Sequence, residues 1–435
     1  MMAPGFVLTA VDLGEGILAV RILISGGDGY LGWPTAMSLS AHGHEVAVAD
    51  NYLRRQLVTQ SGSDSLTPIS TLPQRAAAWK EVSGSTIDVH VIDLCDFDLV
   101  NRVVRDFHPD AIVHYGQIPS APYSMQGRSQ AIFTQLNNVE NNLNVIFAIL
   151  ENNPDCHLVK LGTMGEYGCP NIDIEEGYLE IEHNGRTDTL PFPKVPHSWY
   201  HASKVADSTN IHFASRVYGL RATDLNQGVV YGANTAETAL HRDLATRFDY
   251  DGIWGTVLNR FCAQAAIGQP LSVHGKGGQT RGFLDIRDTV ACVELACSNP
   301  PQAGEFRVFN QFTEQFSILD LANRVRDARA EHGLPTEIVH QPNPRVELEG
   351  HYYNAKHQHL LDLGLQPHAL ADTLIEDVVH VVERHASRVR PHTLVTAVDW
   401  RKGGEVYGPA DASPASLELV AEEAVAEPMA AQAGR

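Results

Sequence analysis

The sequence lacks the features that would mark a membrane or nucleic-acid protein. No run reaches the ~18–20 apolar residues of a transmembrane helix. Residues 1–20 lack the basic start of a signal peptide, and Asp12 and Glu15 interrupt their apolar character. Among 435 residues, 52 acidic side chains outnumber 32 basic ones, which gives a net charge of −20. We therefore expect no nucleic-acid or membrane partner, and a few well-placed cations must hold any anionic substrate.

Cysteine is scarce and scattered. The six cysteines form no C-x-x-C pair, and the 21 histidines form no H-E-x-x-H pattern. We therefore expect no metal site, and we expect reduced thiols in a cytoplasmic protein.

A glycine-rich turn stands near the start of the chain. The apolar, β-branched run 21–25 predicts a buried parallel strand, and an amphipathic segment at 30–41 predicts a helix. Between them, glycines recur every third residue, which allows a tight turn and close approach of the backbone to a pyrophosphate. Strand, turn and helix in this order predict a dinucleotide-binding unit. We assign its phosphate contacts to Gly26, Gly29, Tyr30, Leu31 and Gly32.

Apolar runs and amphipathic segments then alternate along the chain. Further strands are predicted at 45–50, 87–92, 111–115, 157–161 and 221–225, and helices at 72–82, 98–107, 130–150 and up to about residue 218. This alternation predicts an α/β fold, a doubly wound parallel Rossmann sheet.

Past residue 230 the periodicity weakens and Gly and Pro separate short elements. Helices are predicted at 256–268, 318–332 and 370–390, with strands at 271–274 and 283–286. We expect a leader at 1–20, a dinucleotide-binding domain at 21–230 and a smaller, interleaved α/β substrate lobe at 231–395. Because residues 396–435 turn to Ala, Glu, Gly and Pro, we expect a disordered tail there.

The end of the second strand indicates which dinucleotide binds. Asp50 fits the ribose hydroxyls and would repel a 2′-phosphate, which favours NAD, although Arg54 and Arg55 are of the type that accommodates that phosphate. Asp93 could accept from the adenine amino group or could cap the next helix. The remaining predicted cofactor contacts are Asn51, Leu94, Gly116 and Asn138.

A tyrosine and a lysine one helical turn apart carry the chemistry. Tyr200 and Lys204 share a helix face, so the lysine ammonium and the positive nicotinamide could lower the tyrosine pKa from its usual ~10. Tyr200 could then take a proton from a sugar hydroxyl. Thr163, at the end of the fifth strand, supplies a hydroxyl that could orient the substrate.

Longer motifs resemble one family of extended short-chain dehydrogenase/reductases. They lie at 161–168 (LGTMGEYG), 171–177, 183–190, 224–232 (DLNQGVVYG), 275–281 (GKGGQTR), 309–316 and 342–347 (PNPRVE). These runs are similar to the UDP-sulfoquinovose synthases, over about residues 21–390. The resemblance implies that NAD oxidises C4 of UDP-glucose, water leaves from C5–C6, sulfite adds at C6, and C4 is reduced again. It also implies a homodimer packed through the helices at 130–150 and 200–218.

The same resemblance implies the site residues around the sugar nucleotide. Thr163, Tyr200 and Lys204 would take part in the transfer of the proton and the hydride. Glu166 and His201 would transfer the protons at C5 and C6. The alternative is that Glu166 caps a turn and His201 merely packs. Contacts to the UDP-sugar would come from Thr163, Met164, Asn226, Gln279, Arg281, Arg345 and Glu347.

One loop departs from that family. After the fourth strand the family has Gly-Glu-Gln-Arg, whereas this chain has Gly116 followed by Gln117, Ile118 and Pro119. The missing arginine is the most obvious anchor for sulfite, so a sulfite-independent NDP-sugar 4-epimerase or dehydratase stays open as an alternative. A non-catalytic NAD-binding regulator is a third hypothesis, which the Thr163, Tyr200 and Lys204 set disfavours.

Overall fold

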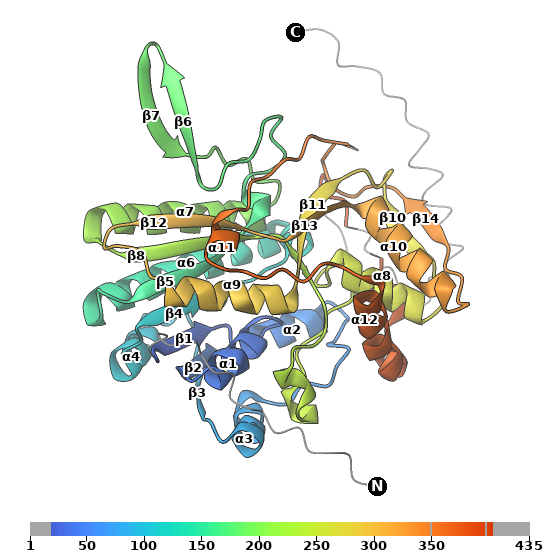
Figure 1. Ribbon diagram of the computed structural model, residues 1–435, viewed down its shortest axis with the longest axis horizontal. Coiled ribbons are helices and arrows are strands. Elements are labelled where there is room, and N and C mark those ends of the chain that lie inside the picture. Colours follow the sequence, from blue (N-terminus) through green and yellow to red (C-terminus); the bar gives the residue numbers. More distant parts are fainter. Residues whose placement is uncertain (1–18, 349, 396–397, 403–435) are drawn as a thin grey trace.

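A seven-stranded parallel sheet forms the centre of the computed structural model, which describes residues 19–348, 350–395 and 398–402 (Figure 1). Its strand order is β12-β8-β5-β4-β1-β2-β3. The strands are β1 (Arg21–Ser25), β2 (Glu45–Asp50), β3 (Ile87–Val91), β4 (Ala111–His114), β5 (His157–Thr163), β8 (Arg221–Gln227) and β12 (Phe306–Gln311). The predicted doubly wound parallel sheet is confirmed. The predicted leader up to residue 18 and the tail from 403 lie outside the described residues.

Side chains alternate between the two faces of this sheet. Ile22, Ile24 and Val48 face a layer that includes α1 (Gly32–Ala41), α3 (Leu72–Ser83) and α9 (Ile286–Ser298). Leu23 and Ala47 face α4 (Phe97–Phe107), α6 (Arg128–Asn152) and α7 (Trp199–Tyr218). Burial on both faces explains why the central strands β1, β2 and β4 are apolar runs that could be predicted from the sequence.

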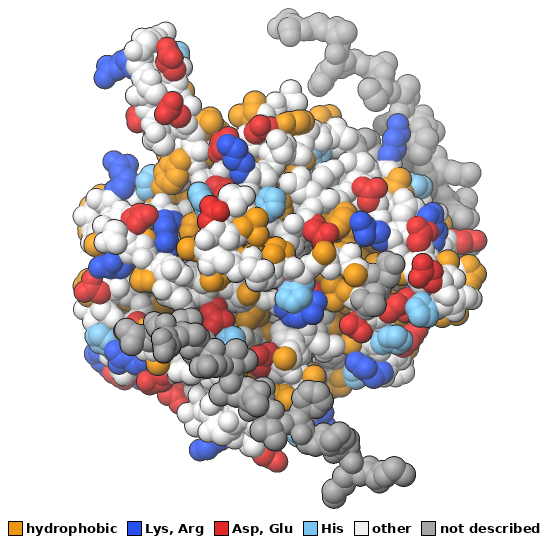
Figure 2. Space-filling model, in the orientation of Figure 1, with side chains coloured by type: hydrophobic (Ala, Val, Ile, Leu, Met, Phe, Trp, Pro, Cys, Tyr) orange, Lys and Arg blue, Asp and Glu red, His pale blue; other side chains and the backbone are white. Residues whose placement is uncertain are grey.

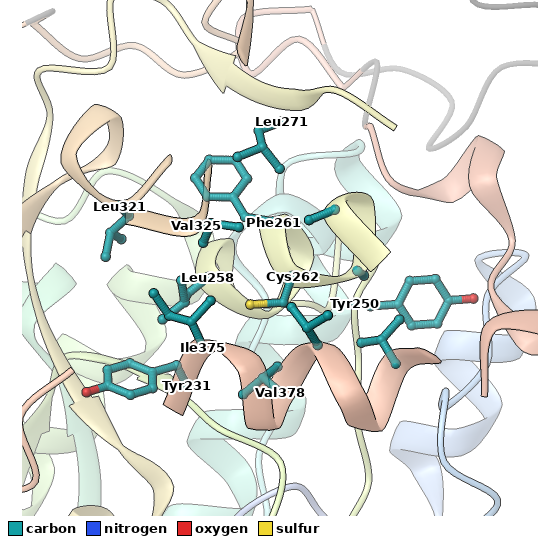
Figure 3. Close-up of a cluster of buried hydrophobic side chains, with 14 of the residues drawn as sticks. Tyr231, Tyr250, Leu258, Phe261, Cys262, Leu271, Leu321, Val325, Ile375 and Val378 are labelled. Carbon is teal, nitrogen blue, oxygen red and sulfur yellow. The ribbon is translucent and has the colours of Figure 1, made fainter. Parts of the chain in front are cut away.

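A second core belongs to the later part of the chain. It packs α8 (Val257–Ala266), α10 (Ile318–Glu331) and α12 (Asp372–Arg384) around Leu258, Phe261 and Val325 (Figure 3). Two small sheets border it: β10 (Leu271–His274) with β14 (Ile338–Gln341), and β9 (Val229–Tyr231) with β11 (Thr280–Asp285) and β13 (Glu314–Ser317). The two parts of the structure interleave along the chain. Strand β12 and the helices α9 and α11 (His359–Asp362) come after residue 231 in the sequence, but they pack with the large sheet.

Several elements were not expected from the sequence. A hairpin of β6 (Tyr178–His183) and β7 (Arg186–Pro191) projects away from the body, and both acidic and basic side chains lie on it (Figures 1 and 2). Every residue of β7 is exposed, so this strand has no buried face whose apolar pattern would reveal it. Two short helices, α2 (Leu53–Gln60) and α5 (Ala121–Ser124), lie in stretches for which no helix range was predicted. No helix among the described residues is long and apolar enough to cross a membrane.

Candidate active site

One continuous cavity of about 470 Å³ runs along the carboxyl ends of β1, β2, β4 and β5 and into the second core. Ligands of doubly wound folds bind at this edge of the sheet. The glycine turn lines one end, Thr163 and Tyr200 the middle, and Arg281 and Arg345 the other end. The structure therefore brings the main predicted groups to a single site.

The glycine turn fits a pyrophosphate. Gly26 has a φ of +83°, which favours glycine, and a Cβ on Gly32 would lie 2.1 Å from the carbonyl oxygen of Gly26. Helix α1 has no side-chain cap, so the backbone N–H groups of its first turn remain available to an anion beside the cavity. Tyr30 and Leu31, which were predicted as cofactor contacts, line the cavity at this end.

Acidic side chains surround the expected adenosine end. Asp50 lines the cavity and accepts hydrogen bonds from the backbone N–H groups of Asp28 (3.0 Å) and Tyr52 (2.6 Å). Burial, together with the Asp28 charge, raises the pKa of Asp50 to about 6. Asp93 also lines the cavity, and its carboxylate accepts from the N–H of Cys95. The alternative role of Asp93 as a helix cap is wrong, because Asp96 caps α4. Asn51, Leu94 and Gly116 line this part too.

The two arginines that complicated the cofactor prediction are both engaged elsewhere. Arg54 pairs with Asp249 at 2.7 Å and lies over the Trp254 ring. Arg55 pairs with Asp28 at 2.6 Å and does not line the cavity. Arg55 was predicted as a cofactor contact; the structure instead uses it to neutralise a buried carboxylate beside the glycine turn. Arg54 nevertheless lines the cavity, where its guanidinium is shared with Asp249.

At the middle of the cavity, Thr163, Tyr200 and His201 face the same space. The Thr163 hydroxyl accepts from the N–H of Gly165 at 3.1 Å. Nδ1 of His201 lies 3.0 Å from the Ser198 hydroxyl, and burial lowers the pKa of His201 to about 3. A neutral imidazole therefore lines the cavity next to Tyr200.

Lys204 lies just behind this wall. Its ammonium donates to the side-chain oxygen of Gln117 and to the carbonyl oxygen of Leu161 (2.7 Å). In the chain alone, burial, followed by the Glu166 charge, raises the pKa of Tyr200. The lowering expected from Lys204 together with a nicotinamide stays a prediction. Burial, with Lys160 nearby, lowers the pKa of Lys204 itself.

Gln117 joins the loop that departs from the family to this lysine. While its oxygen accepts from Lys204, its amide donates to Asp207 (2.7 Å) and to the backbone oxygen of Asn138 (2.9 Å). The uncharged Gln117 side chain thus links the Lys204 ammonium to the buried Asp207 carboxylate and holds the loop in place. Ile118 and Pro119 line the cavity but bring no charge.

Glu166 has a structural position, and its predicted proton-transfer role is revised. Its side chain is fully buried outside the cavity, and it pairs with Lys160 at 3.0 Å and with Lys194 at 2.5 Å. Although burial opposes ionisation, the two ammonium groups hold the pKa of Glu166 well below its usual range. Glu166 also accepts from the N–H of Thr163 and closes a capping box there. The turn-capping alternative therefore describes Glu166.

The sugar-nucleotide end carries the predicted cations. Arg281 forms an ion pair with Glu347 and bonds to His351 Nε2 at 3.1 Å. Arg345 lines the same region, with its guanidinium carbon 4.9 Å from the Trp400 ring centre. Gln279 and Met164 line the cavity as well, and the Gln279 side-chain oxygen is buried with no protein partner.

Besides Arg55 and Lys204, two more predicted contacts do not line the cavity. Asn226 was predicted to bind UDP, but it is fully buried and its amide donates to the Tyr167 hydroxyl at 2.8 Å. Asn138 was predicted to bind the cofactor. Its side chain instead accepts a hydrogen bond from the N–H of Ile118 and donates one to the carbonyl oxygen of the same residue. Both residues support the loops that form the wall.

Sequence reasoning missed part of the cavity wall. Arg260 of α8 is buried at the sugar-nucleotide end and donates to the Ser272 carbonyl oxygen at 3.2 Å. A single arginine in the apolar run at 257–263 was a signal that could have revealed it. Ile253 and Trp254 also line the cavity, from a segment without periodicity that gave no signal. No group of three or more His, Cys, Asp or Glu residues could hold a metal ion in the part of the chain that the structure describes.

Comparison with known proteins defines the class. A family model described as the NAD dependent epimerase/dehydratase family matches residues 22–310. A crystal structure of UDP-glucose 4-epimerase with UDP-glucose from Thermotoga maritima superposes with a TM-score of 0.64 at 18% identity, covering 84% of this chain and 99% of that one. That likeness supports the fold alone.

Two curated relatives narrow the class. The chloroplastic UDP-sulfoquinovose synthase of Spinacia oleracea is 57% identical over 384 residues, which are 88% of this chain and 80% of the relative. The UDP-sulfoquinovose synthase of Sulfolobus acidocaldarius is 41% identical over 386 residues, 88% of this chain and 98% of that one. The chain belongs to the NAD dependent epimerase/dehydratase family and, within it, to the UDP-sulfoquinovose synthase family.

Proposed function

We propose that this chain converts UDP-glucose and sulfite into UDP-6-sulfo-6-deoxyglucose, with NAD as a resident cofactor. The observation that carries the proposal is the single cavity, which joins a dinucleotide cradle, the Thr163 and Tyr200 pair and a cluster of arginines. When bound, NAD supplies the oxidant and later the reductant for C4, and its positive ring adds a charge beside Tyr200.

The side chains of the middle region would divide the proton transfers. Tyr200 would accept the proton of the C4 hydroxyl, and Thr163 would orient that hydroxyl from the end of β5. Lys204 would act from behind the wall by adding positive charge near the forming phenolate. Because a ketone at C4 acidifies C5, a base beside C5 could then remove its proton, and His201 lines the cavity at this place. Water leaves from C5–C6, sulfite adds at C6, and C4 is reduced again.

The diphosphate would bind at the arginine end. Arg281 and Arg345, both half-buried, and the buried Arg260 supply guanidinium groups, which suit oxyanions in an acidic protein. Glu347 is paired with Arg281, so a diphosphate would compete with that carboxylate or share the arginine with it.

A sulfite-independent 4-epimerase or dehydratase is the second candidate. The observation in its favour is the neutral loop at Gln117, Ile118 and Pro119, which offers no cation to an anionic nucleophile. Both candidates use the same C4 oxidation, so only the product distinguishes them. Incubation with UDP-glucose and with or without sulfite, followed by mass spectrometry, separates a sulfonated sugar nucleotide from UDP-galactose or a 4-keto product.

We further propose a homodimer and a cytoplasmic location. Large apolar side chains remain exposed on α6 and α7, including Phe133, Leu136, Phe213 and Val217, which are 39%, 62%, 55% and 56% exposed. An apolar face of two adjacent helices suits pairing with a second copy.

All six cysteines are free thiols, which suits a reducing compartment.

A further inference from the structure

Residues 398–402, from the stretch expected as a tail, reach the substrate cavity. Trp400 lines its wall and is 8% exposed. Its ring belongs to an apolar cluster with Ile118, Tyr123 and Trp254, which come from widely separated parts of the chain. A residue near the far end of the described chain therefore closes a gap in the wall.

Trp400 is joined to the segment that carries Arg345. Its backbone N–H donates to the carbonyl oxygen of Pro344 at 3.0 Å, one residue before Arg345. Its ring lies under the Arg345 guanidinium, 4.9 Å from the guanidinium carbon to the ring centre. Among the described residues, no carboxylate lies within ion-pair distance of Arg345. Burial lowers its pKa, the charge of Glu347, which pairs with Arg281, opposes that effect, and the indole contacts the face of the guanidinium.

The geometry of this contact suits anion binding. An indole attracts the flat face of a guanidinium, whereas oxyanions bind the N–H groups at its edge. Both interactions can therefore occur at the same time. By contrast, Arg281 at the same end already gives its edge to Glu347 and His351. Arg345 is thus the guanidinium that is held by its face and keeps its edge for a ligand.

We propose that Trp400 is a positioning residue that fixes Arg345 for the diphosphate of the nucleotide sugar. The inference rests on the proposed function, since it assumes a UDP-sugar in this cavity. The inference makes residues 398–402, here called the strap, part of the substrate site. The indole would act by holding Arg345, without contacting the sugar or the uracil base itself.

Trp400→Leu in the full-length, NAD-loaded protein tests this role, because leucine keeps apolar packing and removes the π face. Titration calorimetry would measure the binding of UDP and of uridine. We expect UDP to bind about tenfold more weakly in Trp400→Leu, as a desolvated cation–π contact is lost, while uridine binding is unchanged. Trp400→Phe should recover part of the affinity. Arg401→Ala, an exposed neighbour in the same strap, is the matched control and should bind UDP like the wild type.

A double-mutant cycle separates positioning from packing. In an Arg345→Ala background, Trp400→Leu should cause no further loss of UDP affinity. Unchanged UDP binding in Trp400→Leu, equal losses for UDP and uridine, or a full further loss in the Arg345→Ala background would each overturn the inference. If the wild-type protein binds neither UDP nor UDP-glucose, the proposed function fails instead, and the two failures are distinguishable.

Discussion

Replacing Glu166 with glutamine tests whether this residue supports the site or takes part in the chemistry. The carboxylate accepts from Lys160 (3.0 Å), Lys194 (2.5 Å) and the Ser208 hydroxyl (2.9 Å) without reaching the cavity. Glutamine has the same shape but only one accepting oxygen and no charge, so one ammonium loses its partner. Lys194 can turn to solvent, since its side chain is 14% exposed, but Lys160 is fully buried.

The expected loss of stability follows from these contacts. A hydrogen bond to a charged group contributes about 1.5–3 kcal/mol, and disruption of a buried ion pair costs about 3–5 kcal/mol. Because Lys160 keeps Asp224 at 3.2 Å as a second partner, we expect Glu166→Gln to lower the free energy of unfolding by about 3 kcal/mol. Lys194→Gln is the matched control; it leaves the Lys160 pair intact and should lose about 1 kcal/mol or less.

Denaturant unfolding and steady-state turnover give the two readouts. Glu166→Gln should unfold earlier but, below its melting transition, keep kcat within about threefold of the wild type, since a catalytic acid or base would contribute about a hundredfold or more. A hundredfold loss of kcat with unchanged stability would refute the structural role.

The pH dependence has a definite sign. The folded-state pKa of Glu166 is depressed below the ordinary 4.5, so its contribution to stability is fully present above that pH and is lost as the pH falls. The stability difference between wild type and Glu166→Gln should thus be constant above about pH 5 and shrink in acid. A difference that grew on acidification would contradict the assigned ion pairs.

Three further predictions address the cofactor, the base and the dimer. Tyr200→Phe should lower turnover at least a hundredfold while the purified protein keeps its NAD, measured by absorbance and by extraction of the nucleotide; normal turnover would reject Tyr200 as the base. Gly32→Ala should abolish NAD retention, because its Cβ would overlap the Gly26 carbonyl oxygen at 2.1 Å, whereas Gly127→Ala meets no atom closer than 3.6 Å and should retain it; equal retention would contradict the assigned cradle. Leu136→Glu should convert a dimer into monomers in light scattering, and an unchanged mass would exclude this face as the interface.

The central strands β1, β2 and β4 could be predicted because they are buried on both faces. The ranges predicted at 21–25 and 45–50 agree with β1 and β2, and α6 extends only two residues beyond each end of its predicted range. Strand β12 was missed although its residues overlap a recognised motif, because polar side chains (Arg307, Asn310 and Gln311) interrupt its apolar pattern. The β6–β7 hairpin packs too little apolar surface to leave a pattern.

The site could be predicted where a residue ends a strand or occupies a motif. Thr163, Tyr200, Arg281 and Arg345 line the cavity because strand ends and loops meet there. Motifs do not report the direction of a side chain, so Asn226 was assigned to the substrate although its amide turns toward Tyr167. The contact between Arg345 and Trp400 joins two loops with no shared periodicity, and only the folded chain reveals it.

The central claim is that this cavity sulfonates a UDP-sugar, and product analysis with purified, NAD-loaded protein tests it most directly. With UDP-glucose and sulfite, we expect a new sugar nucleotide whose mass increases by the replacement of one hydroxyl by a sulfonate, and we expect none of it when sulfite is omitted. Interconversion of UDP-glucose and UDP-galactose, independent of sulfite and without a sulfonated product, would contradict the account.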